Sequence, residues 1–127
     1  MTAGTHGSTY GGNPLGCAIG AKVLEIVGDE AFLADVNRRA GLLRQKLEGL
    51  VAAHPDAFEA VRGSGLMLGL KCKAPNLDVV RASYDEELLT VPAADNVVRL
   101  LPALNITDDE IAEAVARLDR AASNLSA

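Results

Sequence analysis

The chain has 127 residues, of which 49% are hydrophobic and 23% are charged, the proportions of one ordinary globular domain. Its net charge of −5, with 12 Lys and Arg residues scattered along the sequence, argues against a nucleic-acid partner. No apolar run approaches the roughly 20 residues of a membrane span, and the first residues lack the pattern of a secretion signal. We therefore expect a cytoplasmic protein that does not bind a membrane.

The two cysteines, Cys17 and Cys72, have no partner Cys or His at the spacing of a zinc site. A disulfide framework is also not expected from two such residues. We predict no metal site and interpret both cysteines as reduced structural thiols.

Two helices are predicted in the first half of the chain. Asn13 suits an N-cap and Pro14 suits the first helical position, so the first helix begins there and ends before Gly28. Asp29 can cap the second helix, which ends at His54. Each helix carries one apolar stripe and therefore needs a partner surface.

The glycine-rich segment before the first helix carries a chemical signal. Backbone N–H groups of its glycines, the hydroxyls of Ser8 and Thr9 and the positive end of the helix dipole together suit a phosphate. The segment matches neither common Gly-rich phosphate motif, and a flexible leader would have a similar composition. From the residues alone, both interpretations stay open.

After Pro55 the hydrophobic period changes towards two, which predicts strands. We expect strands over 58–62 and 66–72 around a Gly-Ser-Gly turn, a helix over 76–85, and strands over 88–91 and 96–101 around the turn-prone residues 92–95. Thr107 and Glu110 form a capping box that begins a last amphipathic helix.

This order of elements predicts an α+β fold: a small antiparallel or mixed sheet of about four strands, covered by helices over one face. We expect three parts: a Gly-rich loop over 1–12, a connecting helix over 13–28, and a small C-terminal domain over 29–127. The boundary near residue 28 follows because the first helix does not obviously belong to the sheet domain.

Arg99 is the only charged residue in the apolar run from 97 to 101. Because side chains alternate along a strand, it can be a residue that simply faces solvent. Its planar guanidinium can also bind a carboxylate through two bonds. The residues alone do not choose between these roles.

The segment 4–15, Gly-Thr-His-Gly-Ser-Thr-Tyr-Gly-Gly-Asn-Pro-Leu, resembles the signature segment of the class III pyridoxal-phosphate aminotransferases. The resemblance continues through 61–67 and 96–102 and so spans the chain. Within that family the acetylornithine branch is the most similar, from residues 88–93 and 99–102. The resemblance implies the C-terminal small domain of a fold-type I enzyme, in a homodimer, without its large N-terminal domain.

The resemblance also implies roles for single residues. Thr9 corresponds to a threonine that binds the phosphate of the pyridoxal phosphate in the neighbouring subunit, and Ser8 lies beside substrate and cofactor. Arg99 corresponds to the arginine that binds the substrate carboxylate. No catalytic residue is expected in this chain, because the Schiff-base lysine lies upstream in relatives and the lysines present here stand in other contexts.

Three further residues allow two interpretations each. His6 can be a general base, but it is more readily explained as a residue that shapes the loop. Tyr10 can lie against the neighbour's active site or pack at the subunit contact. Arg62 fits a hairpin corner with a salt bridge better than it fits a ligand.

The implied reaction is exchange of an amino group between N-acetylornithine and 2-oxoglutarate in arginine biosynthesis. Ornithine, succinylornithine and 4-aminobutyrate are alternative amino donors within the family. The alternative from another class is a non-catalytic interaction module that uses the first helix and the Gly-rich segment to join other chains.

Overall fold

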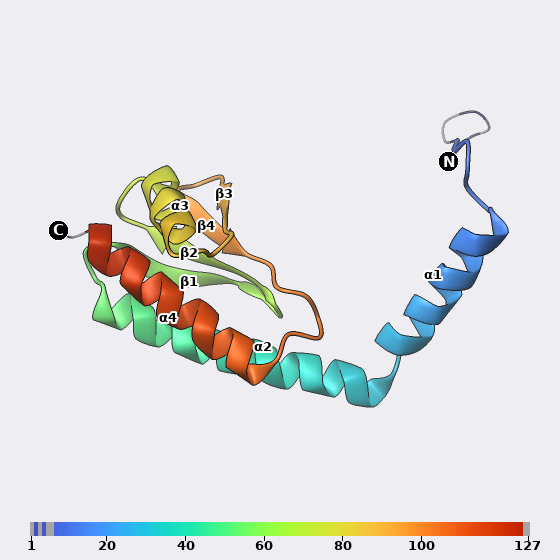
Figure 1. Cartoon of the computed structure of the whole chain (residues 1–127), viewed down its shortest axis with the longest axis horizontal. Coiled ribbons are helices and arrows are strands. Elements are labelled where there is room, and N and C mark those ends of the chain that lie inside the picture. The colour runs from blue at the N-terminus through green and yellow to red at the C-terminus, as the bar shows by residue number, and fades with distance from the viewer. Residues whose placement is uncertain (1, 3, 5–6, 126–127) are drawn as a thin grey trace. The chain divides into compact units, whose positions relative to one another are not determined.

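The computed structural model describes residues 2, 4 and 7–125, in two compact units, Met1–Ala34 and Asp35–Ala127. Figure 1 shows the elements along the chain. Their bounds are α1 Pro14–Val27, α2 Glu30–Ala53, β1 Phe58–Ser64, β2 Met67–Cys72, α3 Asn76–Asp85, β3 Val91–Ala93, β4 Val97–Leu100 and α4 Asp108–Leu125. None of the described helices is long and apolar enough to cross a membrane.

The first helix begins and ends as predicted. The side chain of Asn13 accepts a hydrogen bond from the Gly16 amide at 2.8 Å, and Pro14 occupies the first turn. At the other end the Gly28 amide donates to the Leu24 carbonyl at 2.9 Å. None of the α1 residues is buried, so the apolar stripe of this helix lies uncovered within its own unit.

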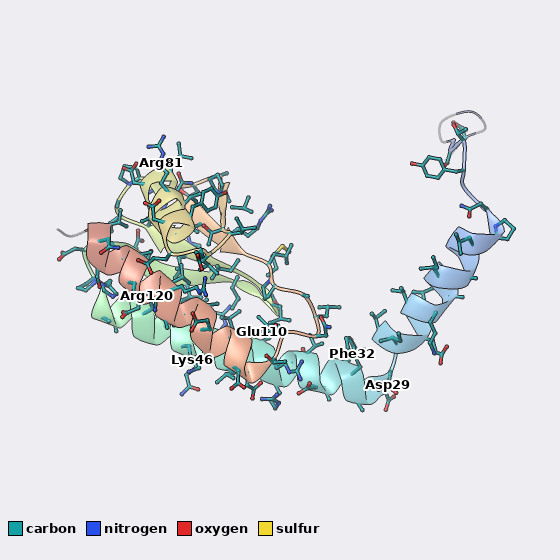
Figure 2. All side chains as sticks on the ribbon, in the orientation of Figure 1. Asp29, Phe32, Lys46, Arg81, Glu110 and Arg120 are labelled. Carbon is teal, nitrogen blue, oxygen red and sulfur yellow. The ribbon has the colours of Figure 1, made fainter. Side chains whose placement is uncertain are left out.

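Helix α2 begins with the predicted aspartate cap. The Phe32 amide donates to the Asp29 carboxylate at 2.8 Å, and Figure 2 shows both residues at the start of the helix. Further along, one face of α2 is buried at helical spacing, through Ala40, Leu43, Leu47 and Leu50. The predicted apolar stripe is therefore the face that packs into the core.

The strands form one antiparallel sheet in the order β1-β2-β4-β3. Residues that face each other across antiparallel strands point to the same side of a sheet. Leu70 pairs with Val98 and both are fully buried, whereas Gly69 pairs with Arg99 on the other side. We call the side that carries Arg99 the open face. The predicted α+β fold with a sheet of about four strands is confirmed.

The core lies between the helices and the side of the sheet that faces away from Arg99. Figure 1 shows α2 and α4 running along the same side of the sheet. The core residues include the fully buried Leu47, Phe58, Leu70, Ile111 and Leu118. Each such side chain contributes about 1.5–3 kcal/mol through burial. Exposed ion pairs between elements contribute about 0–1 kcal/mol each, so the apolar core dominates the stability.

One strand lies further along the chain than the sequence predicts. The pattern predicts a strand over 88–91, but β3 covers Val91–Ala93 and contains Pro92, which the prediction placed in a turn. The end of α3 explains the shift. Glu87 adopts a left-handed φ of 57°, and the Leu88 amide donates to the Ser83 carbonyl at 2.8 Å, which closes the helix. Pro92 is tolerated because β3 is an edge strand.

The last helix has the predicted capping box. The Thr107 amide donates to the Glu110 carboxylate at 2.7 Å, and the Glu110 amide donates to the Thr107 hydroxyl at 3.2 Å. These hydrogen bonds lower the pKa of Glu110 below its ordinary value. The ionised carboxylate therefore stabilises the start of α4 at neutral pH.

The β1–β2 hairpin gives a test of the fold through Gly63. Gly63 has φ +107°, and a Cβ there would overlap the carbonyl oxygen of Met67. We expect Gly63→Ala to lower the unfolding free energy by about 2 kcal/mol or more. The control is Gly49→Ala, where the added Cβ meets open space on α2. The control should raise stability by about 0.5–1 kcal/mol in urea titrations. Equal effects of the two variants would contradict the hairpin geometry.

Candidate functional site

The loop before α1 brings two hydroxyl side chains to an exposed position. Ser8 and Thr9 are both exposed, and neither hydroxyl is hydrogen-bonded to any residue that the structure describes. The loop bends back tightly here, because a Cβ on Gly11 would lie 3.0 Å from the Ser8 Cβ, and Gly12 has φ +77°. Glycine is therefore favoured at position 12 by its backbone conformation, and a side chain at position 11 would require Ser8 to shift. His6 lies outside the described residues.

The amides at the start of α1 are already used inside the chain. The Gly16 amide donates to the Asn13 side chain and the Cys17 amide donates to the Asn13 carbonyl at 3.0 Å. The Asn13 side chain donates in turn to the Tyr10 carbonyl at 2.8 Å. The hydroxyls of Ser8 and Thr9, in contrast, have no described partner and stay available to an anion. Hydroxyl groups are hydrogen-bond donors that suit a phosphate.

Arg99 lies in the middle of β4 on the open face. It is exposed, and no described residue forms an ion pair or hydrogen bond with its guanidinium. Its two cross-strand neighbours are Gly69 on β2 and Val91 on β3. Gly69 has no room for a side chain, because a Cβ there would lie 2.6 Å from the Val97 Cγ1. Arg99 is thus a free cation beside small and apolar neighbours.

The other two cations of the open face are both bound by one carboxylate. Arg62 pairs with Gly69 from the β1 side, and its guanidinium forms a short ion pair with Asp95. Lys71 Nζ donates to the Asp95 carboxylate at 2.9 Å and to the Asp95 carbonyl at 2.6 Å. These bonds, first from Lys71 and then from Arg62, lower the pKa of Asp95. Arg62 has the salt bridge that the sequence predicted.

No lysine here resembles a covalent cofactor anchor, which needs a cation that can lose its proton in a desolvated pocket. Lys22 forms an ion pair with Glu25 at 2.8 Å, and Lys71 is bound to Asp95. Lys73 is exposed, and Figure 2 shows Lys46 on the side of α2 away from the sheet. The chain therefore fits the phosphate edge of the cofactor and not its covalent attachment.

Both cysteines are free thiols, but only one of them is packed. Cys72 is buried, and desolvation raises its pKa to about 11, so the thiol stays protonated at neutral pH. Cys17 is exposed on α1, which corrects the prediction that both are structural. Among the described residues, no group of three or more His, Cys, Asp or Glu side chains could hold a metal ion.

An apolar cavity of about 190 Å³ lies beside the core rather than on the open face. Its lining includes Leu43, Leu88, Leu100, Ile106, Val115 and Leu118 and contains no charged residue. A carboxylate or phosphate would therefore find no partner in it. Each unit thus has its own candidate region: the open face around Arg99 in the second unit, and the hydroxyl pair of Ser8 and Thr9 in the first.

Sequence reasoning predicts roles for Arg99, Ser8 and Thr9 but misses the neighbours of Arg99. Gly69 lies two residues before Lys71 on β2, so strand alternation alone could have placed both on one face. Asp95 could not be found in this way, because it reaches Lys71 and Arg62 from a turn outside the strands. The roles of Ser8, Thr9 and Arg99 stay predictions.

Comparison with known proteins gives one consistent family. Residues 1–122 match the family Aminotransferase class-III. The chain is 71% identical over 125 residues to the acetylornithine aminotransferase of Rhodobacter capsulatus, which covers 98% of this chain and 32% of that protein. It is 52% identical to the corresponding protein of Mesorhizobium japonicum over 99% of this chain and 32% of that protein.

Solved structures agree with this. The acetylornithine aminotransferase of Elizabethkingia anophelis superposes with a TM-score of 0.83 at 29% identity, over 98% of this chain and 33% of that chain. An ornithine aminotransferase from Toxoplasma gondii superposes with a TM-score of 0.82 at 30% identity, over 98% of this chain and 30% of that chain. The chain thus spans about a third of the length of the relatives that it matches.

Proposed function

Because the chain belongs to the class-III aminotransferase family, we propose that it forms the C-terminal third of an acetylornithine aminotransferase. The observation that carries the proposal is the 71% identity to a protein of that name along nearly the whole chain. The complete enzyme exchanges an amino group between N-acetylornithine and 2-oxoglutarate, a step of arginine biosynthesis, as a cytoplasmic homodimer. Its large N-terminal domain supplies the lysine that binds the cofactor.

In this proposal Arg99 binds the carboxylate of the substrate. An exposed guanidinium without an internal partner can offer two parallel N–H bonds to one carboxylate, which fixes both its distance and its orientation. The substrates of an amino-group transfer carry such a carboxylate next to the reacting carbon. Holding it orients that carbon for reaction, which lowers the entropic part of the barrier.

Ser8 and Thr9 bind the cofactor side of the site. Pyridoxal phosphate supplies an electron sink when it is bound. The Thr9 hydroxyl donates to a phosphate oxygen of the cofactor in the neighbouring subunit, and Ser8 lies close to both cofactor and substrate. Neither hydroxyl is bonded to a described residue, which supports this role because no such bond must break first.

An ornithine aminotransferase is the second candidate. Structures of that enzyme superpose on the chain almost as well as acetylornithine aminotransferases do, with TM-scores of 0.82 and 0.83. Sequence identity favours the first candidate, because acetylornithine aminotransferases reach 71% and the ornithine enzyme of Toxoplasma gondii has 30%.

The first test compares the chain with the complete enzyme. The purified chain of 127 residues, given pyridoxal phosphate, acetylornithine and 2-oxoglutarate, should show no turnover. The complete enzyme should turn over at about 1 per second or faster. Ornithine and 4-aminobutyrate serve as competing donors. Turnover by the chain alone, or a higher kcat/KM of the complete enzyme for ornithine than for acetylornithine, would contradict the proposal.

The role of Thr9 is tested in the complete enzyme by Thr9→Ala. Loss of a hydroxyl donor to a dianionic phosphate should weaken cofactor binding by about 1.5–3 kcal/mol, read from cofactor titration by absorbance. Thr9→Ser, which keeps the hydroxyl, is the control. In hybrid dimers where one subunit lacks the cofactor lysine, the loss should appear only when that subunit carries Thr9→Ala. Loss from the subunit's own site would contradict the cross-subunit role.

The role of Arg99 is tested by Arg99→Lys, which keeps the charge and removes the planar fork. The KM for 2-oxoglutarate or for the amino donor should rise about tenfold or more, equal to about 1.4 kcal/mol. Cofactor absorbance and melting temperature should stay close to the parental values. Arg81→Lys, at an exposed arginine on α3, is the matched control. Unchanged KM values for both substrates would remove Arg99 from the site.

A further inference from the structure

Asp95 forms ion pairs with two of the cations on the open face. The three cations of this face are Arg62, Lys71 and Arg99. Arg62 and Arg99 flank Gly69 from the two neighbouring strands, so their Cα atoms lie about two strand spacings, or roughly 10 Å, apart. Both side chains are long enough to reach one ligand that lies between them. Arg62 is instead bound to the Asp95 carboxylate.

The position of Asp95 is fixed by the turn that carries it. Asp95 and Asn96 both have positive φ, 59° and 52°. The Asn96 side chain donates to the carbonyls of Cys72 at 2.7 Å and Ala74 at 2.9 Å, and accepts from the Asn76 amide at 2.8 Å. The turn is thereby tied to the end of β2 and to the start of α3. The Asp95 carboxylate therefore meets Arg62 and Lys71 at a defined place.

The ion pair between Asp95 and Arg62 does little for stability. The side chains of Asp95 and Arg62 are 63% and 50% exposed, and exposed pairs are worth about 0–1 kcal/mol. Their effect on ligand binding is larger in principle, because a carboxylate ligand competes with Asp95 for the same donors. With Asp95 in place, Arg99 is the cation of the face that is free of any described partner.

We propose that Asp95 is a positioning residue for substrate specificity: it holds Arg62 and Lys71 at the turn, so that Arg99 alone receives the substrate carboxylate. This inference rests on the proposed function. The site then binds one carboxylate at one place. Without the Asp95 carboxylate Arg62 is released, whereas Lys71 keeps its hydrogen bond to the carbonyl of residue 95. A dicarboxylate then bridges Arg99 and Arg62, and binds tightly in an orientation that does not react.

The test is Asp95→Asn in the complete enzyme with its cofactor bound. Asparagine has nearly the same shape and tolerates positive φ, so the turn should persist. The dissociation constant of glutarate, measured by calorimetry, should fall about tenfold, equal to about 1.4 kcal/mol, while that of butyrate stays within about twofold. With 2-oxoglutarate as substrate, both KM and kcat should fall. If Asp95 only stabilised the turn, Asp95→Asn would weaken the binding of glutarate instead.

Two further variants serve as controls. Asp78→Asn removes an exposed carboxylate paired with Arg81 on α3, so it changes the net charge equally without touching the open face. It should leave glutarate binding unchanged. Arg62→Gln combined with Asp95→Asn removes the released cation and should return glutarate binding towards the parental value. If Asp95→Asn folds poorly, Asp95→Gly replaces it, because glycine suits the same φ.

The outcomes separate this inference from the proposed function. If the parental enzyme does not transfer an amino group from acetylornithine to 2-oxoglutarate, the proposed function is wrong, whatever the dissociation constant of glutarate. A parental enzyme that is active, with an Asp95→Asn variant whose glutarate binding is unchanged, weakened or equal to that of Asp78→Asn, overturns the role of Asp95. Tightened glutarate binding that Arg62→Gln reverses supports it.

Discussion

The pairing of β4 with β2 is the contact on which the rest of the structure depends. Val98 and Leu70 face each other and are both fully buried, and this fixes the register of the two strands. A slip by one residue would bury Arg99 and expose Val98. Burying a guanidinium without a partner costs far more than the roughly 2 kcal/mol gained by burying a valine. The core therefore holds Arg99 on the open face, and Gly69 and Val91 beside it.

The helices could be predicted from the sequence because each carries its own boundary signals. Asn13 with Pro14, Asp29, and Thr107 with Glu110 form local caps, and these need no knowledge of the rest of the chain. The sequence pattern places the strand after α3 about three residues before its observed start, because that start depends on how the helix ends. Glu87 has a left-handed φ, and the Leu88 amide donates to the Ser83 carbonyl. This amide is therefore not available to pair in a strand over 88–91.

The candidate site could be predicted only in part, for a related reason. Arg99 stands out in the sequence as one charge in an apolar run, but whether it is free depends on where the competing carboxylates lie. Asp95 is 33 residues from Arg62 and 24 from Lys71, and no local pattern links them. The hydroxyls of Ser8 and Thr9 belong to the other compact unit, and no local pattern in the sequence links them to Arg99.

Because Arg99 is exposed, the strength of its bond to a carboxylate depends on how polar the surroundings of the open face are. A guanidinium in full contact with water gains little from a carboxylate, because exposed pairs are worth about 0–1 kcal/mol. The same pair is several times stronger when the surroundings are less polar. Met67 and Val91 are on the open face and are 55% and 45% exposed, so a covering segment would remove apolar surface from water next to Arg99. The binding strength of Arg99 for a carboxylate therefore depends on how much water stays in contact with these two side chains.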